Sequence, residues 1–172
     1  AFGDIFMVFN NQKKGLDTVT DYHRGLDITE ATTTTSYTQD GTTFKRETFS
    51  SYPDDVTVTH LTKKGNKTLD FTLWNSLTED LLANGDYSWE YSNYKNGHVT
   101  TDEHGILLKG TVKDNGLKFA SYLGIKTDGT VTVQNETLTV TGASYATLYL
   151  SAKTNFAQNP KTNYRKDIDL EK

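Results

Sequence analysis

The 172-residue sequence predicts an all-β domain built from antiparallel strands. Threonine occupies 29 positions, beside ten tyrosines and eight phenylalanines, and β-branched and aromatic side chains favour the half-buried surface of a sheet. Apolar and polar residues alternate with a period of two in several short stretches, which is typical of strands with one solvent-exposed face. The spacing of these stretches suits a sandwich or a barrel, and no part of the chain shows a βαβ pattern.

The first predicted strand is Ile5–Phe9, in which all five residues are apolar. A strand that is apolar on both faces is expected between two layers rather than on an outer sheet. Alternating strands are then predicted at residues 56–59 and 68–73, and in the second of these the odd positions are apolar. The same pattern returns at residues 131–133, 138–140 and 148–152.

Four dipeptides that tolerate positive φ angles predict tight turns between strands. They are Asp40-Gly41, Asn96-Gly97, Asn115-Gly116 and Asp128-Gly129. A capping-box pattern that starts at Ser76 predicts at most a short helical insertion between Leu77 and Asn84.

Alternation stops near residue 160, so residues 1–160 are predicted to form the β-sandwich domain and the charged residues 161–172 a linker. A start at Ala1 with neither an initiator Met nor a leader leads us to expect a part of a longer polypeptide.

Composition excludes several classes of function. The chain contains no cysteine, so it has neither a disulfide framework nor a thiolate metal site. Its longest apolar run has five residues, far fewer than the roughly 20 that cross a bilayer, so no membrane insertion is expected. The net charge is −4 and the Lys and Arg residues are scattered, which argues against nucleic acid as a partner. Because the glycines are spaced as turns, no phosphate-binding loop and no cofactor are predicted.

Three carboxylate pairs could in principle supply an acid and a base for glycoside cleavage. They are Asp54-Asp55, Glu79-Asp80 and Asp102-Glu103. Each falls at a predicted turn or helix start, where acids cap backbone N–H groups, so we predict structural roles and no catalytic residue in this chain. His98 and His104 lie near Asp102 and Glu103, but the spacing matches no metal motif and no metal site is expected.

An aromatic segment spans residues 87–94. Tyr87, Trp89 and Tyr91 would share one face of a strand, and Tyr94 follows. Such a row can stack on the apolar face of a sugar ring, so Trp89, Tyr91 and Tyr94 are candidate carbohydrate-binding residues. The same side chains would equally suit a core or a domain interface, and the sequence leaves both readings open.

Three segments, taken in order, resemble the N-terminal β-domain of glycoside hydrolase family 95, the inverting α-L-fucosidases. They are Gly3-Asp4-Ile5, residues 21–28 (DYHRGLDI) and residues 37–56 (YTQDGTTFKRETFSSYPDDV). Stretches between residues 116 and 156 are similar to the closing strands of that domain. The most specific part, here called the family block, consists of Arg46, Glu47, Phe49, Pro53 and Asp54. Gly25 and the aromatic segment depart from the family pattern.

Physical reasoning gives the family block a structural role. Pro53 fixes its own φ and keeps Tyr52 extended, which predicts a turn between two strands. Arg46 and Glu47 are neighbours on a strand, so they face opposite sides and either could tie the sheet to another layer.

The resemblance implies an antiparallel β-supersandwich that precedes an (α/α)6 barrel carrying the catalytic residues. It therefore implies a non-catalytic N-terminal domain of an α-1,2-L-fucosidase, packed on the barrel and inactive alone. Fucosylated glycans would be the substrate of the parent enzyme, outside or on the surface of a bacterial cell. The alternative is an independent carbohydrate-binding or adhesive surface module.

Overall fold

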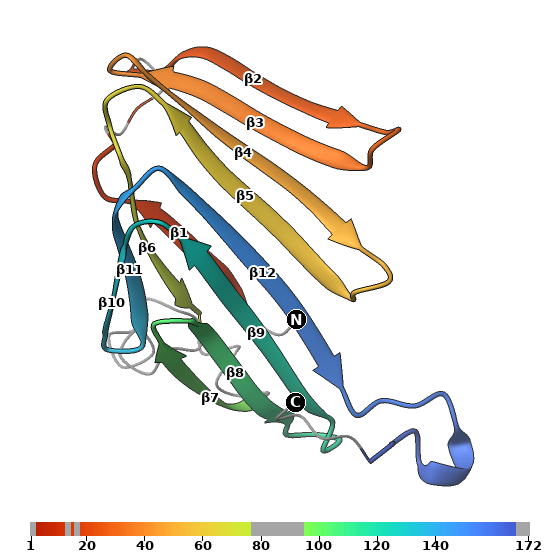
Figure 1. Ribbon diagram of the computed structural model, residues 1–172. Helices are drawn as coiled ribbons and strands as arrows, with labels where there is room; N and C mark the ends of the chain where they lie inside the picture. The colour runs from red at the N-terminus through yellow and green to blue at the C-terminus, as the bar shows by residue number, and fades with distance from the viewer. Residues whose placement is uncertain (1–2, 13–14, 16–17, 77–94, 168–172) are drawn as a thin grey trace.

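The fold is a sandwich of two antiparallel β-sheets, as the sequence predicts (Figure 1). The computed structural model describes residues 3–12, 15, 18–76 and 95–167. Within these ranges every strand pair is antiparallel, and a 3₁₀ turn, η2, lies at Pro160–Thr162. None of the described residues belongs to a helix that could cross a membrane. The expected helical insertion between Leu77 and Asn84 lies outside the described residues.

Twelve strands form the two sheets. They are β1 (Ile5–Phe9), β2 (Thr20–Asp27), β3 (Thr32–Gln39), β4 (Thr42–Ser51), β5 (Val56–Lys64), β6 (Leu69–Asn75), β7 (Lys95–Asp102), β8 (Gly105–Val112), β9 (Lys118–Thr127), β10 (Thr130–Gln134), β11 (Thr137–Ala143) and β12 (Tyr145–Thr154).

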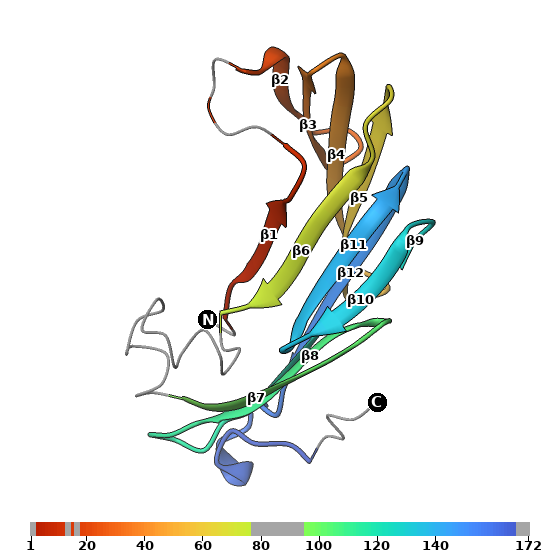
Figure 2. The ribbon, with the colours of Figure 1, turned by 90° about the vertical axis from the view of Figure 1, so that its left-hand side faces the viewer.

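The two sheets differ in size. The large sheet has eight strands in the order β2-β3-β4-β5-β12-β9-β8-β7, and the small sheet has four in the order β1-β6-β11-β10. Figures 1 and 2 show that the small sheet covers one part of the large sheet, while β2, β3 and β4 extend past it. The face of the large sheet toward the small sheet is called the inner face below, and the opposite one the outer face.

The core lies between the small sheet and strands β4, β5, β7, β8, β9 and β12 of the large sheet. In β6 the predicted alternation is confirmed, because Leu69, Phe71 and Leu73 are buried and the residues between them are partly exposed. Phe71 is fully buried and stands opposite Phe9 on one side and Val140 on the other. Burying one such side chain stabilises the fold by roughly 1.5–3 kcal/mol.

The threonine surplus is strand surface. Threonine hydroxyls meet across neighbouring strands at Thr38–Thr43, Thr48–Thr59 and Thr72–Thr139, with oxygen–oxygen distances of 3.0, 3.0 and 3.1 Å. Cross-strand pairs of this kind each contribute roughly 0.2–1 kcal/mol. The residue type that dominates the composition therefore also holds the register of the sheets.

β1 corrects one prediction. It forms the edge of the small sheet instead of lying between two layers, and it pairs with β6 only, among the described strands. Ile5, Met7 and Phe9 pack against the core, whereas Val8 is 45% exposed and Phe6 stacks on Trp74. The second apolar face of β1 is thus an outer face of the sandwich.

The turn dipeptides have mixed outcomes. Asp40-Gly41 joins β3 to β4 and Asn115-Gly116 joins β8 to β9, as predicted, and all but Asn115 have positive φ. Asp128-Gly129 is also a connection, but it crosses from the large sheet to the small one. Asn96-Gly97 was predicted as a turn and that prediction is wrong, because both residues pair within the β7–β8 ladder.

Candidate functional site

The family block lies on β4 and in the turn that follows it. Arg46 faces the inner side of the large sheet, together with Thr48 and Thr59. Glu47 faces the outer side and forms an ion pair with Lys45, with 2.8 Å between Nζ and Oε1. The prediction that Arg46 and Glu47 face opposite sides is confirmed. Phe49 shares the outer side with Glu47, in register with Val58 of β5.

Pro53 and Asp54 build the β4–β5 turn. Residues 52–55 form this turn, and Asp55 has a φ of 53°. The Ser51 hydroxyl donates to the Asp54 carboxylate at 2.5 Å. This bond closes the turn, so Asp54 has the structural role that its position in the sequence predicts.

In the Asp102-Glu103 pair, Asp102 contacts the backbone of the turn. The Asp102 carboxylate accepts the N–H groups of His104 and Gly105 at 2.8 and 3.0 Å, which shapes the turn between β7 and β8. Among the described residues, no three His, Asp or Glu side chains are grouped as metal ligands would be. Glu79-Asp80 lies outside the described residues, and so do the sugar-binding candidates Trp89, Tyr91 and Tyr94.

A hollow of about 460 Å³ opens on the inner face beside the edge strand β1. It extends over β2, β3, β4 and β5, where the small sheet no longer covers the large one. Its wall toward the core is apolar, and the rest of its lining is polar. The apolar wall consists of Ile5, Met7, Leu73, Leu123, Leu148 and Leu150, and the remaining lining consists of Tyr22, Arg24, Thr33, Thr35, Arg46, Thr48, Thr57 and Thr59.

Two arginines line this hollow, one on each side of β3. Arg24 of β2 and Arg46 of β4 both pair with Thr35 of the strand between them. Residues directly opposite each other on paired strands project from the same face, so both guanidinium groups reach into the hollow. Within the described part of the chain, neither guanidinium has a carboxylate or hydrogen-bond partner.

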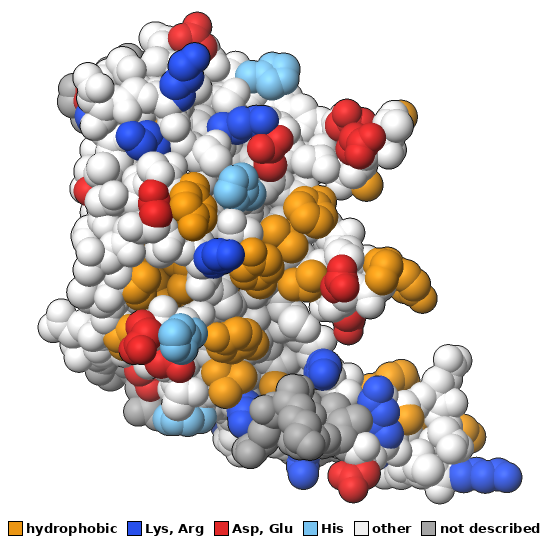
Figure 3. All heavy atoms as spheres, in the orientation of Figure 1, with side chains coloured by type: hydrophobic (Ala, Val, Ile, Leu, Met, Phe, Trp, Pro, Cys, Tyr) orange, Lys and Arg blue, Asp and Glu red, His pale blue; other side chains and the backbone are white. Residues whose placement is uncertain are grey.

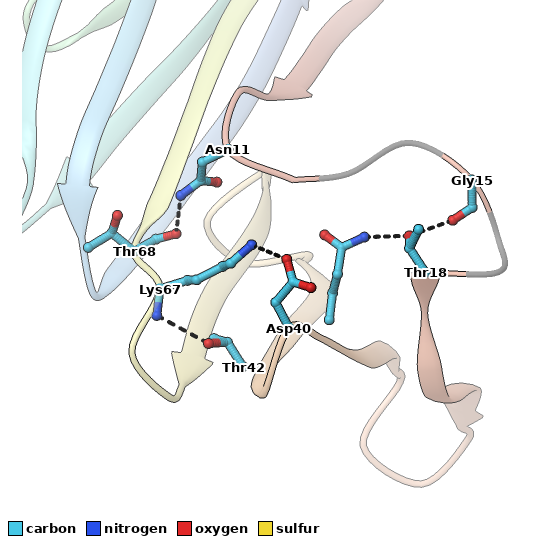
Figure 4. Close-up of polar contacts among 8 residues, drawn as sticks. Asn11, Gly15, Thr18, Asp40, Thr42, Lys67 and Thr68 are labelled. Atoms are coloured by element: carbon cyan, nitrogen blue, oxygen red, sulfur yellow. Dashed lines mark hydrogen bonds and ion pairs between the residues drawn. The ribbon is translucent and has the colours of Figure 1, made fainter.

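Polar contacts hold together the end of the sandwich where the β3–β4 hairpin meets the start of β6 (Figure 4). Lys67 binds the Asp40 carboxylate at 2.5 Å through Nζ and donates its N–H to the Thr42 hydroxyl at 3.1 Å. The Gln39 amide donates to the Thr18 hydroxyl at 2.7 Å. These contacts tie the β3–β4 hairpin to the start of β6 and to the segment before β2.

Tyr37 anchors the chain that leaves β1. Its hydroxyl donates to the Gln12 amide oxygen at 2.6 Å, and its ring packs on Phe44 with 5.6 Å between the ring centres. Burial raises the pKa of the Tyr37 hydroxyl. It outweighs the hydrogen bond to Gln12 and the charge of Arg46, which both lower that pKa. The phenol therefore stays neutral and remains a donor across the physiological pH range.

Aromatic side chains gather on the outer face of the large sheet. Phe49, Tyr122 and Tyr149 are each about two-fifths exposed, and Phe49, Val58 and Tyr149 form one row across three strands. Figure 3 shows hydrophobic side chains across the middle of this face, between charged ones. The Tyr122 ring lies over Gly124, where a Cβ would stand 3.1 Å from Cε1. Sequence reasoning missed this patch, because its members come from strands far apart in the chain.

Comparisons with known proteins agree with this architecture. A family model described as "Glycosyl hydrolase family 65, N-terminal domain" matches residues 1–159. Among solved structures, a chain provisionally named a kojibiose phosphorylase, from the human microbiome, is similar with a TM-score of 0.58 and 12% identity. The similarity covers 87% of this chain and 22% of that one, and it concerns the fold. No curated protein matches the sequence at a significant level.

Proposed function

Since this chain belongs to the glycosyl hydrolase family 65 N-terminal domain family, we propose that it is the non-catalytic β-sandwich domain of a longer α-1,2-L-fucosidase. In that enzyme it would support a catalytic (α/α)6 barrel, to which residues 161–172 would lead. The parent enzyme would act on fucosylated glycans outside or at the surface of a bacterial cell.

The observation that carries this proposal is the family block, which resembles glycoside hydrolase family 95 and has structural contacts. Glu47 is paired with Lys45 on the outer face, and Asp54 closes a turn. The carboxylate of Asp102 is likewise engaged with backbone N–H groups. Because acids with such partners are committed to the backbone or to a neighbouring cation, they are poorly placed for proton transfer to a sugar.

The relative of known structure is much longer than this chain, which supports a role as one domain among several. The chain matches 22% of that relative's length. A domain of this kind contributes packing and orientation, while the acid and the base of the reaction come from another part of the enzyme.

Two polypeptides test the proposal: the 172-residue chain, and the longest natural polypeptide that contains it. Both are incubated with α-1,2-fucosylated lactose and, separately, with kojibiose plus phosphate. We expect fucose release by the longer polypeptide and none by the 172-residue chain, whose folding is checked by circular dichroism. Turnover by the short chain contradicts the non-catalytic role, and phosphate-dependent cleavage of kojibiose by the longer one contradicts the fucosidase assignment.

The outer aromatic row supports a second candidate, a carbohydrate-binding or adhesive surface module. Exposed aromatic rings on a flat sheet can stack on sugar rings. Titrating α-1,2-fucosylated lactose while recording tyrosine proton shifts by NMR would show saturable changes at Tyr149 and Tyr122. Tyr149→Ala would abolish them, whereas Tyr52→Ala, at an exposed turn, would not. A flat titration excludes this candidate.

A further inference from the structure

We propose that the hollow beside β1 is the docking surface for an extended, acidic segment of the polypeptide outside these 172 residues. Its carboxylates would pair with Arg24 and Arg46. This inference rests on the proposed function, because it needs a further domain in the same protein. It specifies the face of the sandwich that contacts that domain, and it names arginine–carboxylate pairing as the interaction.

The small sheet ends beside the hollow and leaves part of the large sheet uncovered there. The large sheet has eight strands and the small sheet four, and β1 ends the small sheet beside the hollow. The edge of β1 away from β6 pairs with no described strand. Such an edge offers backbone N–H and C=O groups in a row and accepts an extended chain readily. An occupant that ran along β1 would continue the small sheet over β4 and β3.

The apolar wall of the hollow favours contact with protein over contact with bulk water. Its apolar wall includes Ile5, Met7 and Leu150, which are only partly buried although they pack against the core. Side chains of an inserted segment would complete the burial of this wall, which is the main source of favourable free energy in such contacts.

The positive charges of Arg24 and Arg46 determine which side chains the occupant must carry. Arg24 and Arg46 are separated by one intervening strand, so their Cα atoms are about 10 Å apart. At that separation each guanidinium can hold its own carboxylate through two parallel N–H bonds. Neither has an acidic partner in the described part of the chain, although the protein as a whole carries a net charge of −4. The threonine hydroxyls around them supply further hydrogen bonds but no charge.

Arginine modification tests the proposal directly. Phenylglyoxal is applied to the folded 172-residue chain and to the longest natural polypeptide that contains it, and the rate at each arginine is followed by peptide mass spectrometry. We expect Arg24 and Arg46 to react about tenfold or more slowly in the longer polypeptide, because a charge-assisted pair covers each guanidinium. Equal rates in the two proteins would overturn the proposal.

Variants of the longer polypeptide test the contact from the other side. Arg24→Met with Arg46→Met is expected to speed amide hydrogen exchange in β1 by about tenfold or more, since the docked segment protects it. Lys126→Met is the matched control, because it removes a cation from the outer face. Should the double Met variant fail to fold, the Arg24→Lys with Arg46→Lys variant keeps both charges and is expected to show a smaller increase. Unchanged exchange in both arginine variants would contradict the docking.

Two further arms identify the occupant. Galacturonate is titrated into the 172-residue chain during modification. Protection of the arginines by this sugar acid, together with full reactivity in the longer polypeptide, would replace the proposed segment with an anionic glycan. The fucose-release assay is run on the same longer polypeptide. Loss of arginine protection with fucose release intact refutes the docking alone, and protection without fucose release refutes only the fucosidase assignment.

Discussion

Asp128 shows how one exposed carboxylate organises a crossing between the sheets. It accepts the N–H groups of Ser144 and Tyr145 at 2.8 and 3.2 Å and also the Ser144 hydroxyl. The Ser144 hydroxyl is the largest cause of a lowered pKa of Asp128, followed by the Tyr145 N–H. These bonds favour the ionised form in the folded protein.

The pKa shift of Asp128 predicts a pH dependence of stability. Because the folded-state pKa is below the unfolded one, the contribution is complete above about pH 4 and is lost as the pH falls through the folded-state value. Asp128→Asn should therefore lower Tm at pH 6 and flatten the loss of Tm between pH 4 and 2. Thermal unfolding followed by circular dichroism measures this. Parallel pH profiles for the two proteins would rule out the assigned role.

Phe71 is one of the largest fully buried side chains among the described residues. It is fully buried between Phe9 and Val140. Phe71→Ala should lower the free energy of unfolding by about 3–5 kcal/mol, because it removes apolar contacts and leaves a cavity. Val133→Ala, at a two-fifths exposed position of β10, should cost about 0.5 kcal/mol. Urea denaturation gives both values, and a similar cost for both would show that the core is not centred at Phe71.

Among the elements, the β8–β9 pair leaves no room for a side chain at Gly105. A Cβ at Gly105 would stand 2.2 Å from the Leu123 carbonyl oxygen. Gly105→Ala should therefore push the two strands apart and cost at least about 1–3 kcal/mol. Gly25→Ala is the control, because the nearest atom there is the His23 Nε2 at 3.4 Å. Urea denaturation is the measurement, and equal stability of the two variants would contradict this reading of the contact.

At the scale of the elements, the sequence predicts where the strands lie better than it predicts which strands pair. Alternation places Leu69, Phe71 and Leu73 correctly, because the burial of alternate residues is a local pattern. Asn96-Gly97 was misread since pairing with β8 overrides a local turn preference. Gly110 lies opposite Gly97, and a Cβ at Gly110 would stand 2.4 Å from the Phe119 ring. The ladder therefore requires glycine at position 110 for space, and Gly97 is paired in that ladder instead of forming a turn.

The arginine pair could not be predicted in the same way. Arg46 was singled out from the family block, but the side on which Arg24 projects depends on a register shift between Thr20 and His23. One extra residue in a strand moves every later side chain to the other face. Only the pairing of both arginines with Thr35 brings them together, and that pairing is a property of the folded sheet.

At the scale of the whole molecule, the fold class follows from the composition and from the alternation of apolar and polar residues. The division of the strands between the two sheets does not follow from them. β10 and β11 read like the other alternating strands, yet they belong to the small sheet. Their assignment depends on pairing between β11 and β6, which are separated by more than 60 residues. Contacts at such distances are decided by the collective packing of the core rather than by local propensity.

The position of β12 has a consequence for how the protein is made. β12 lies between β5 and β9 and pairs with both, so it joins the strands of the first half of the chain to those of the second. During synthesis the large sheet cannot close until residues near 154 have left the ribosome, and until then both halves present open edges. A chain that ends at residue 143 should remain prone to aggregation, as light scattering during refolding would show. β12 is therefore also the strand whose synthesis completes the pairing of the large sheet.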